Sequence, residues 1–321
     1  MSTTRFLARE KSRSASRAQK KPNFFLVGAP KSGTTAMVHY LRGHPDVFMA
    51  IKEMHFFGRD LRLRAPFYRH TRREYLAEFQ DCNGQRGIGE ASVWYLFSSQ
   101  AASEIHSFNP DARIIIMLRE PADMLYSLYH ELRYLGDEHL PTFQQALGAE
   151  EDRRAGRAIC RRACFGQGLI YREAARYAGQ VQRYFSIFGR ERVHVIIYDD
   201  LANQPARVYR DTLEFLGLDS SYRPADFKII NGNKCVRSPA LRAVVKEPLL
   251  HSSLATVRPL LPRKLIIGMR NFGGWLWSVN TRFSKRPPLE QELRWKLRRE
   301  FTPEIERLSE LLGRDLTHWS K

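Results

Sequence analysis

The sequence predicts an α/β protein with a mostly parallel central sheet that is flanked by helices on both faces. Three short apolar runs, at residues 24–27, 113–118 and 193–198, have the composition of buried parallel strands. Each run leads into a segment with helical features, and such alternation of strand and helix is typical of a parallel sheet.

The helices are predicted from the segments that follow these runs. A glycine-bearing loop after the first run precedes a helix over about 34–42. The second run precedes a helix over about 121–134 with proline at its favoured first turn, and the third precedes a helix that stops at Gly217. An amphipathic helix over about 290–312 closes the chain.

The charge distribution predicts a disordered basic arm at residues 1–22, followed by one domain over 23–321. The arm has seven Lys/Arg and one acid, a net charge of +6. Residues 234–286 have eleven Lys/Arg and one acid, a net charge of +10, so the two segments supply +16 of the chain's +18. No linker separates independent units, and a basic amphipathic cap is expected at about 238–286.

This concentrated charge favours an anionic partner, whether a polyphosphate cofactor, an acidic acceptor or a membrane surface. The cap also carries apolar and aromatic residues, at Leu260, Leu261, Phe272, Trp275 and Trp277. They suit peripheral association with an anionic membrane and a lipid acceptor, while the basic residues suit an acidic glycan acceptor. An ordinary lid is the third interpretation. No motif supports nucleic-acid binding, so none is expected.

Cysteine spacing and hydropathy set further expectations. The four cysteines lack zinc-ligand spacing, so we expect reduced thiols and no metal requirement. No apolar run reaches the length of about 18 residues that a membrane-spanning helix needs. The N-terminus lacks the apolar stretch of a secretory signal. A cytoplasmic location is therefore expected, with peripheral membrane association as an option.

The loop at residues 28–35, which reads GAPKSGTT, joins a predicted strand to a helix in the manner of a phosphate-binding loop. Its spacing nearly matches the Walker A motif, but Thr34 follows the second glycine and Lys31 lies three residues earlier. The second strand ends in Arg119, where a magnesium-dependent NTPase commonly has an acid. The loop is therefore predicted to bind a nucleotide with anionic groups at both ends, without Mg²⁺.

These residues carry a family resemblance. Residues 25–35 resemble the 5′-phosphosulfate loop of sulfotransferases that use 3′-phosphoadenosine-5′-phosphosulfate (PAPS). Residues 118–129 resemble the family's 3′-phosphate segment, and residues 44–47 and 52–57 resemble the acceptor side of its heparan-sulfate-type branch. The resemblance implies a P-loop-NTPase-like sulfotransferase fold. It implies an enzyme that transfers a sulfuryl group from PAPS to a hydroxyl or amine of a lipid or glycan acceptor by in-line displacement. The alternative is a P-loop kinase or NTPase.

The resemblance also assigns residues to roles. Donor binding is expected from the two nucleotide segments and a later loop, at Lys31, Ser32, Gly33, Thr34, Thr35, Arg119, Ser127, Lys234 and Arg237. Lys31 is also expected to stabilise charge on the departing phosphate oxygen. Glu53 is expected to be the general base, with Lys52 beside it and His55 as the competing base.

One segment departs from the family pattern. The family branch often has Lys or Arg followed by Ser/Thr-Pro-Ala-Tyr after the catalytic acid. The corresponding residues 89–95 read GEASVWY and contain neither a basic residue nor a proline. The contribution of this segment to acceptor contact therefore stays open.

Overall fold

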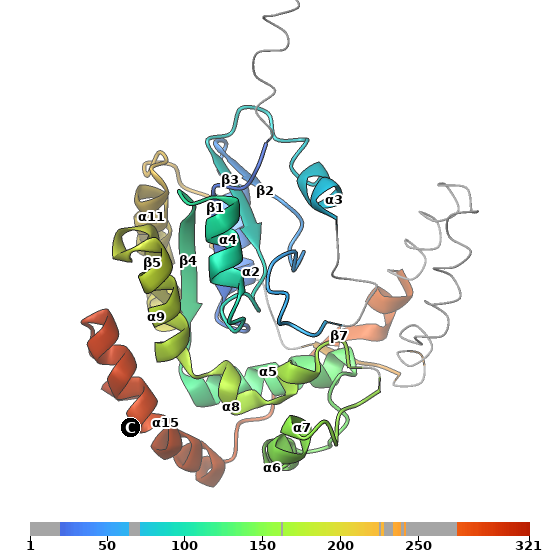
Figure 1. Cartoon of the computed structure of the whole chain (residues 1–321). Coiled ribbons are helices and arrows are strands. Elements are labelled where there is room, and N and C mark those ends of the chain that lie inside the picture. Colours follow the sequence, from blue (N-terminus) through green and yellow to red (C-terminus); the bar gives the residue numbers. More distant parts are fainter. Residues whose placement is uncertain are drawn as a thin grey trace, which may run out of the picture.

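The computed structural model describes residues 20–63, 71–161, 163–224, 226–227, 234–238, 241 and 275–321 (Figure 1). Its centre is a five-stranded sheet in the order β2-β3-β1-β4-β5, in which every neighbouring pair is parallel. The strands are β1 (Phe24–Gly28), β2 (Val47–Met49), β3 (Gly87–Ala91), β4 (Arg113–Leu118) and β5 (Val193–Ile197). The predicted fold class is thereby confirmed.

Two strands of the central sheet were not predicted, and one predicted strand is shorter than expected. Tyr198 begins the helix after β5 and does not end the strand. The short strands β2 and β3 carry no long apolar run. In β3, Gly89 lies opposite Phe24 of β1, and a Cβ atom at Gly89 would stand 2.2 Å from the Phe24 ring. Glycine is therefore required where this ring crosses the neighbouring strand.

The helices confirm most of the predicted segments. They are α2 (Thr34–Arg42), α3 (Arg72–Ala77), α4 (Ala101–Phe108), α5 (Pro121–Leu135), α6 (Phe143–Gly148), α7 (Glu150–Arg154), α8 (Tyr171–Ala174), α9 (Tyr177–Phe188), α10 (Tyr198–Asn203), α11 (Pro205–Leu216) and α15 (Gln291–Leu312). The prediction of a single helix after β5 is wrong. Pro205 starts a new helix, so the segment forms two helices, α10 and α11. Both α11 and α15 end at a left-handed glycine, Gly217 and Gly313.

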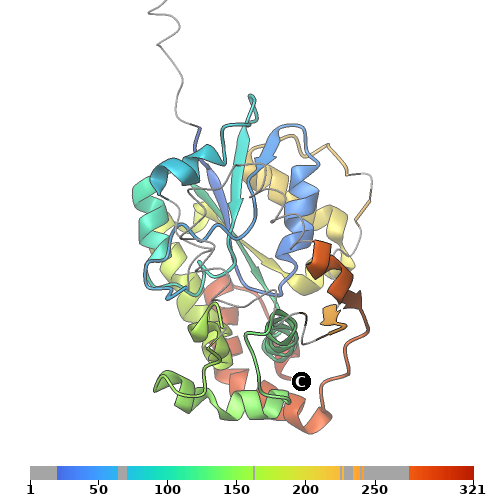
Figure 2. The same ribbon diagram turned by 90° about the vertical axis from the view of Figure 1, so that its right-hand side faces the viewer.

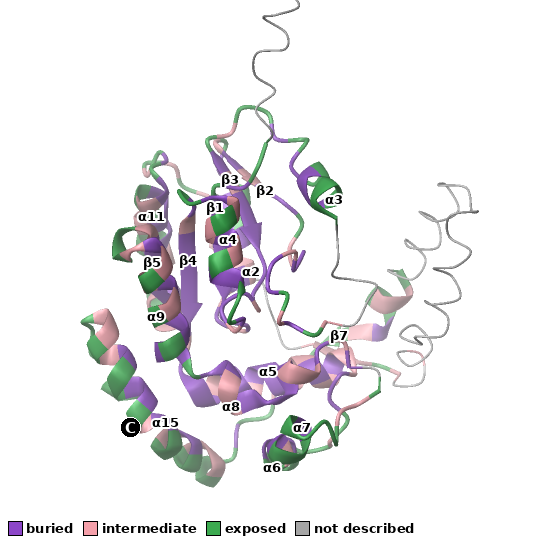
Figure 3. Cartoon of the chain, viewed as in Figure 1, coloured by how far each residue is buried: buried purple, intermediate pink, exposed green. Residues whose placement is uncertain are grey.

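Helices cover both faces of the sheet, as Figure 2 shows. Phe25 and Val27 of β1 belong to a core with residues of α4, α5 and α9, whereas Phe24 and Leu26 belong to a second core with residues of α2 and α11. This alternation follows from the twofold side-chain repeat of a strand. Burial is accordingly continuous along the sheet and the inner helix faces (Figure 3).

The described part of the cap is small and packs against α5. Strands β6 (Lys234–Val236) and β7 (Thr281–Phe283) form an antiparallel pair, and a helical segment at residues 275–280 leads directly into β7. Tyr134 of α5 hydrogen-bonds Thr281 through the two hydroxyls at 2.7 Å, and its ring lies 5.4 Å from that of Trp277. This end of the cap therefore lies beside the predicted 3′-phosphate segment.

Several predictions concern residues outside the described part of the chain. These are residues 1–19 of the basic arm and the cap residues Leu260, Leu261 and Phe272. The end of the predicted arm contacts the domain, since Asn109 donates to the carbonyl of Pro22 at 3.0 Å. Within the described residues, no helix combines the length and the apolar character needed to cross a membrane.

Candidate active site

The loop between β1 and α2 has the backbone shape of an anion-binding turn. Lys31 and Gly33 adopt left-handed conformations, with φ of 60° and 88°. A Cβ atom at Gly33 would lie 3.0 Å from Leu201, so this position favours glycine for both its conformation and its space. Ser32 and Thr34 are buried, and α2 begins at Thr34. The amide groups of this first helical turn therefore face the loop.

Lys31 and Arg119 meet at this loop. The Nζ atom of Lys31 lies 2.8 Å from an oxygen of Glu131 on α5, and both side chains are half-buried. Arg119, which follows β4, donates to the carbonyl of Lys31 at 3.5 Å and lies over the Tyr198 ring at 4.6 Å. The parallel pairing of β1 and β4 brings the two predicted phosphate segments together at one sheet edge.

A second arginine joins this group from the far end of the chain. Arg286, which follows β7, donates from Nη2 to the buried hydroxyl of Ser127 at 2.9 Å and lies 5.8 Å from the Tyr126 ring. Its buried Nε has no hydrogen-bond partner among the described residues. Burial and the charge of Arg119 lower the pKa of the Arg286 guanidinium. Two neighbouring arginines and a hydroxyl thus form a site suited to a phosphate.

Sequence reasoning missed Arg286. The available signal was the basic excess of residues 234–286, but that segment contains eleven Lys/Arg, and charge alone does not single out one of them. Of the later residues that were predicted, Lys234 lies on β6 close to this region. Arg237 is exposed, and its backbone N–H donates to Asn280 at 2.8 Å.

A cavity of about 600 Å³ adjoins the Arg286–Ser127 pair. Its wall includes the aromatic and basic side chains Tyr126, Tyr129 and His130 of α5 and Lys234 of β6, beside prolines and aliphatic residues. Burial, aided by the charges of Arg286 and Arg133, lowers the pKa of His130 to about 4. This histidine is therefore neutral at physiological pH. Such a cavity can enclose a flat heteroaromatic ring beside a phosphate.

Glu53 lies on the loop after β2, where several groups hold its carboxylate. Lys52 contacts one oxygen, while His55 Nε2 and the backbone N–H of Val93 approach the other at 3.1 Å each. Burial alone would raise the pKa of Glu53. The charge of Lys52 and the hydrogen bond from His55 outweigh this effect and lower the pKa to about 2. The side chain remains 31% exposed, so an ionised carboxylate faces outward at neutral pH.

Residues 89–95 support this loop from behind. The backbone N–H of His55 donates to the Ser92 hydroxyl at 3.0 Å, and Ser92 donates in turn to Glu90 at 2.8 Å. Glu90 is fully buried and also accepts from Tyr75 at 2.6 Å and Tyr95 at 2.8 Å. Burial raises the pKa of Glu90 despite these hydrogen bonds. The segment that departs from the family pattern therefore fixes the position of His55.

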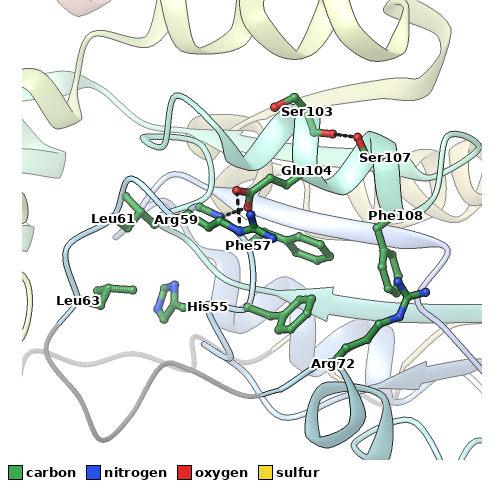
Figure 4. Close-up of a pocket in the computed structure, with 12 residues that line it drawn as sticks. His55, Phe57, Arg59, Leu61, Leu63, Arg72, Ser103, Glu104, Ser107 and Phe108 are labelled. Carbon is green, nitrogen blue, oxygen red and sulfur yellow. Dashed lines mark hydrogen bonds and ion pairs between the residues drawn. The ribbon is translucent and has the colours of Figure 1, made fainter.

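His55 lines a cavity of about 840 Å³ (Figure 4). Aromatic and aliphatic side chains form much of its wall, and Arg72 lies over the Phe108 ring at 5.4 Å. Its rim contains an ion pair between Arg59 and Glu104 at 3.6 Å. His55 thus contacts the Glu53 carboxylate and also lines this cavity, whose wall combines apolar side chains with charged ones.

Comparison with known proteins assigns the chain to a family. A family model for the sulfotransferase domain matches residues 21–246. The chain belongs to the sulfotransferase domain family. The crystal structure of a sulfotransferase from Alicyclobacillus acidocaldarius is 30% identical with a TM-score of 0.70, and the match covers 94% of this chain and 99% of that one. The predicted family and its P-loop-like fold are confirmed, and the alternative of a kinase or NTPase is not favoured.

Curated relatives of this sulfotransferase-family chain include enzymes named for carbohydrates. Human carbohydrate sulfotransferase 15 is 27% identical over 247 residues, which cover 61% of this chain and 44% of the relative. Human heparan sulfate glucosamine 3-O-sulfotransferase 3B1 is 23% identical over 262 residues, which cover 81% of this chain and 62% of the relative. The chain therefore spans about half the length of the curated relatives it matches.

Proposed function

We propose that this chain transfers a sulfuryl group from PAPS to a hydroxyl of a carbohydrate acceptor. The proposal is supported by two neighbouring groups of basic and hydroxyl side chains beside the carboxyl ends of β1 and β4, which we interpret as two anion sites. Lys31 and the first turn of α2 form one site, while Arg119, Ser127 and Arg286 form the other. PAPS carries a phosphosulfate and a separate 3′-phosphate, and therefore has an anionic group for each site.

The residues of these sites fit the donor. The 5′ end would be held by the loop residues Lys31, Ser32, Gly33, Thr34 and Thr35. The unpartnered Nε of Arg286 leaves a buried donor for the 3′-phosphate, beside the Ser127 hydroxyl. The cavity that contains Tyr126, His130 and Lys234 would take the adenine ring. When bound, PAPS supplies the sulfuryl group and a phosphate leaving group.

The protein's own residues then supply charge and proton transfer. Lys31 lies at the loop where the leaving phosphate is bound, and its ammonium would neutralise the charge that develops there. Glu53 is ionised and can accept the proton of the acceptor hydroxyl. Because its pKa is low, proton transfer requires that the hydroxyl has already become acidic through bonding to sulfur. His55 then acts by holding the carboxylate at 3.1 Å, which makes it a positioning residue.

The carbohydrate acceptor is inferred from relatives and charge together. Two relatives are named for carbohydrate and for heparan sulfate glucosamine. Arg237, Arg282 and Lys285 of the described cap are exposed, which suits an acidic polysaccharide. A lipid acceptor at an anionic membrane is the second candidate, because Trp275 and Phe283 are 57% and 69% exposed on the same part of the chain. A cytoplasmic location, with peripheral membrane association as an option, stays a prediction.

The direct test is transfer of label from ³⁵S-PAPS to separate pools of acidic glycans, neutral glycans and lipids, with EDTA present. We expect labelled acidic glycan with wild-type protein and none with Lys31→Ala. Label only in the lipid pool would support the second candidate. Failure of the wild type to bind adenosine 3′,5′-bisphosphate more tightly than adenosine 5′-monophosphate would refute the donor assignment.

A further inference from the structure

A carboxylate lies inside the cationic group that we assign to the donor. Glu131 follows Ser127 by one helical turn on α5, so the two side chains share a face of the helix. Its Oε2 lies 2.8 Å from Nζ of Lys31, and the side chains are 29% and 21% exposed. An acid at this position would repel an anionic ligand, and its presence therefore needs a physical explanation.

The charges around Glu131 explain why an acid lies at this position. Arg119 and Arg286 are close enough for the charge of Arg119 to lower the pKa of Arg286, while Glu131 acts on Arg286 in the opposite direction. Asp123 lies 3.6 Å from Arg119, but it also pairs with Arg294 of α15 at 2.8 Å. Asp123 is therefore fixed by α15. Glu131 instead pairs with Lys31, the residue that the proposed function places at the leaving phosphate.

We propose that Glu131 is a positioning residue that holds Lys31 until the nucleotide arrives and that competes with the nucleotide for this lysine. The proposal rests on the proposed function. In the donor-free protein the carboxylate offsets the charge of Lys31 and fixes its long side chain. With nucleotide bound, the carboxylate and the 5′ phosphate share one ammonium and repel each other. Glu131 therefore weakens the binding of donor and of the bisphosphate product, and it favours product release.

The test is the isosteric variant Glu131→Gln, which removes the negative charge and keeps an oxygen that can accept from Lys31. Calorimetric titration with adenosine 3′,5′-bisphosphate should give a dissociation constant about 1.5- to 5-fold lower than that of wild type, a range expected for one partly exposed charge pair. In turnover assays the variant should show a lower KM for PAPS without a higher kcat. Merely structural damage would raise KM.

Controls separate this inference from the function on which it rests. Glu214→Gln removes one acid from the exposed face of α11, where Glu214 pairs with Arg210 at 3.8 Å, and should leave bisphosphate affinity unchanged. Glu131→Asp keeps the charge but shortens the side chain, and its affinity should lie between those of wild type and Glu131→Gln. Equal or weaker binding by Glu131→Gln, with wild type binding well, overturns this inference alone. A wild type that does not prefer the bisphosphate overturns the proposed function as well.

Discussion

Arg286→Ala gives a sharp test of the donor site, because Arg286 was identified from the structure and not from the sequence. Arg286 approaches Ser127 at 2.9 Å and retains an unpartnered Nε, so a 3′-phosphate would gain at least one charge-assisted hydrogen bond from it. The loss of one such bond costs about 1.5–3 kcal/mol. That range corresponds to a loss of about 10- to 150-fold in affinity for adenosine 3′,5′-bisphosphate. Adenosine 5′-monophosphate lacks the 3′-phosphate and should bind the variant and the wild type alike.

Isothermal titration with both nucleotides checks this expectation. Arg282→Ala is the matched control, because Arg282 lies four residues earlier on β7, is exposed and carries the same charge. It should weaken bisphosphate binding by less than about 2-fold, as expected for an exposed charge. Equal losses for the two nucleotides in Arg286→Ala would mean that the residue supports the fold or the adenine cavity. An unchanged affinity for the bisphosphate would refute the assignment of Arg286 to the phosphate.

Three further predictions concern the base, its protonation and the cap. Glu53→Gln should abolish turnover while leaving bisphosphate affinity within about 2-fold, whereas Lys31→Ala should reduce both, as turnover and titration would show. The pKa of Glu53 is about 2, so its ionised form stabilises the fold above about pH 4.5 and this contribution is lost as the pH falls toward 2. In wild type, kcat/KM should therefore not fall on acidification until the pH is below 4. In Lys52→Ala, the fall should begin at a higher pH. Protein lacking residues 1–19 should sediment with anionic liposomes at low salt but not at high salt, and Trp275→Ala/Phe283→Ala should sediment less.

Each of these predictions has a contradicting result. Turnover by Glu53→Gln would make His55 the next candidate base. A wild-type limb near pH 4.5 would mean that Lys52 and His55 do not hold the carboxylate ionised. Absence of liposome binding at low salt would remove the membrane interpretation and leave an acidic acceptor or an ordinary lid for the cap.

The sequence predicts those strands of the fold that are continuous apolar runs. Strands β1, β4 and β5 are such runs, and α2, α5 and α15 carry clear start or stop signals at their ends. Strand β3 could not be found in this way, because its sequence GIGEA contains two glycines and an acid. Gly89 accommodates the Phe24 ring, and Glu90 is buried only because three hydroxyl groups donate to it. Both residues depend on tertiary contacts that no local pattern shows.

The site could be predicted where its residues follow strands of the sheet. Lys31 lies three residues after β1 and Arg119 directly follows β4, so the parallel pairing of these strands brings the two residues together. Arg286 lies 159 residues from Ser127 in the sequence and reaches it only through the β6-β7 pair that packs on α5. Glu131 was missed for a similar reason, since a helical acid carries no sign that it faces a lysine 100 residues away.

The departure at residues 89–95 is explained by the loop that these residues hold. Four hydrogen bonds join residues 53–57 to residues 91–95, and one runs from the Val93 N–H to Glu53 at 3.1 Å. When the resembling motif is matched on Ser92 and Tyr95, its proline falls at Val93, and a proline has no N–H to donate. The basic residue of the motif corresponds to Ala91, which is buried here. This chain thus has no cation in residues 89–95, but Val93 provides a backbone donor to the Glu53 carboxylate. Lys52 and Val93 together can keep Glu53 ionised without the missing side chain, so the altered motif remains compatible with a working base.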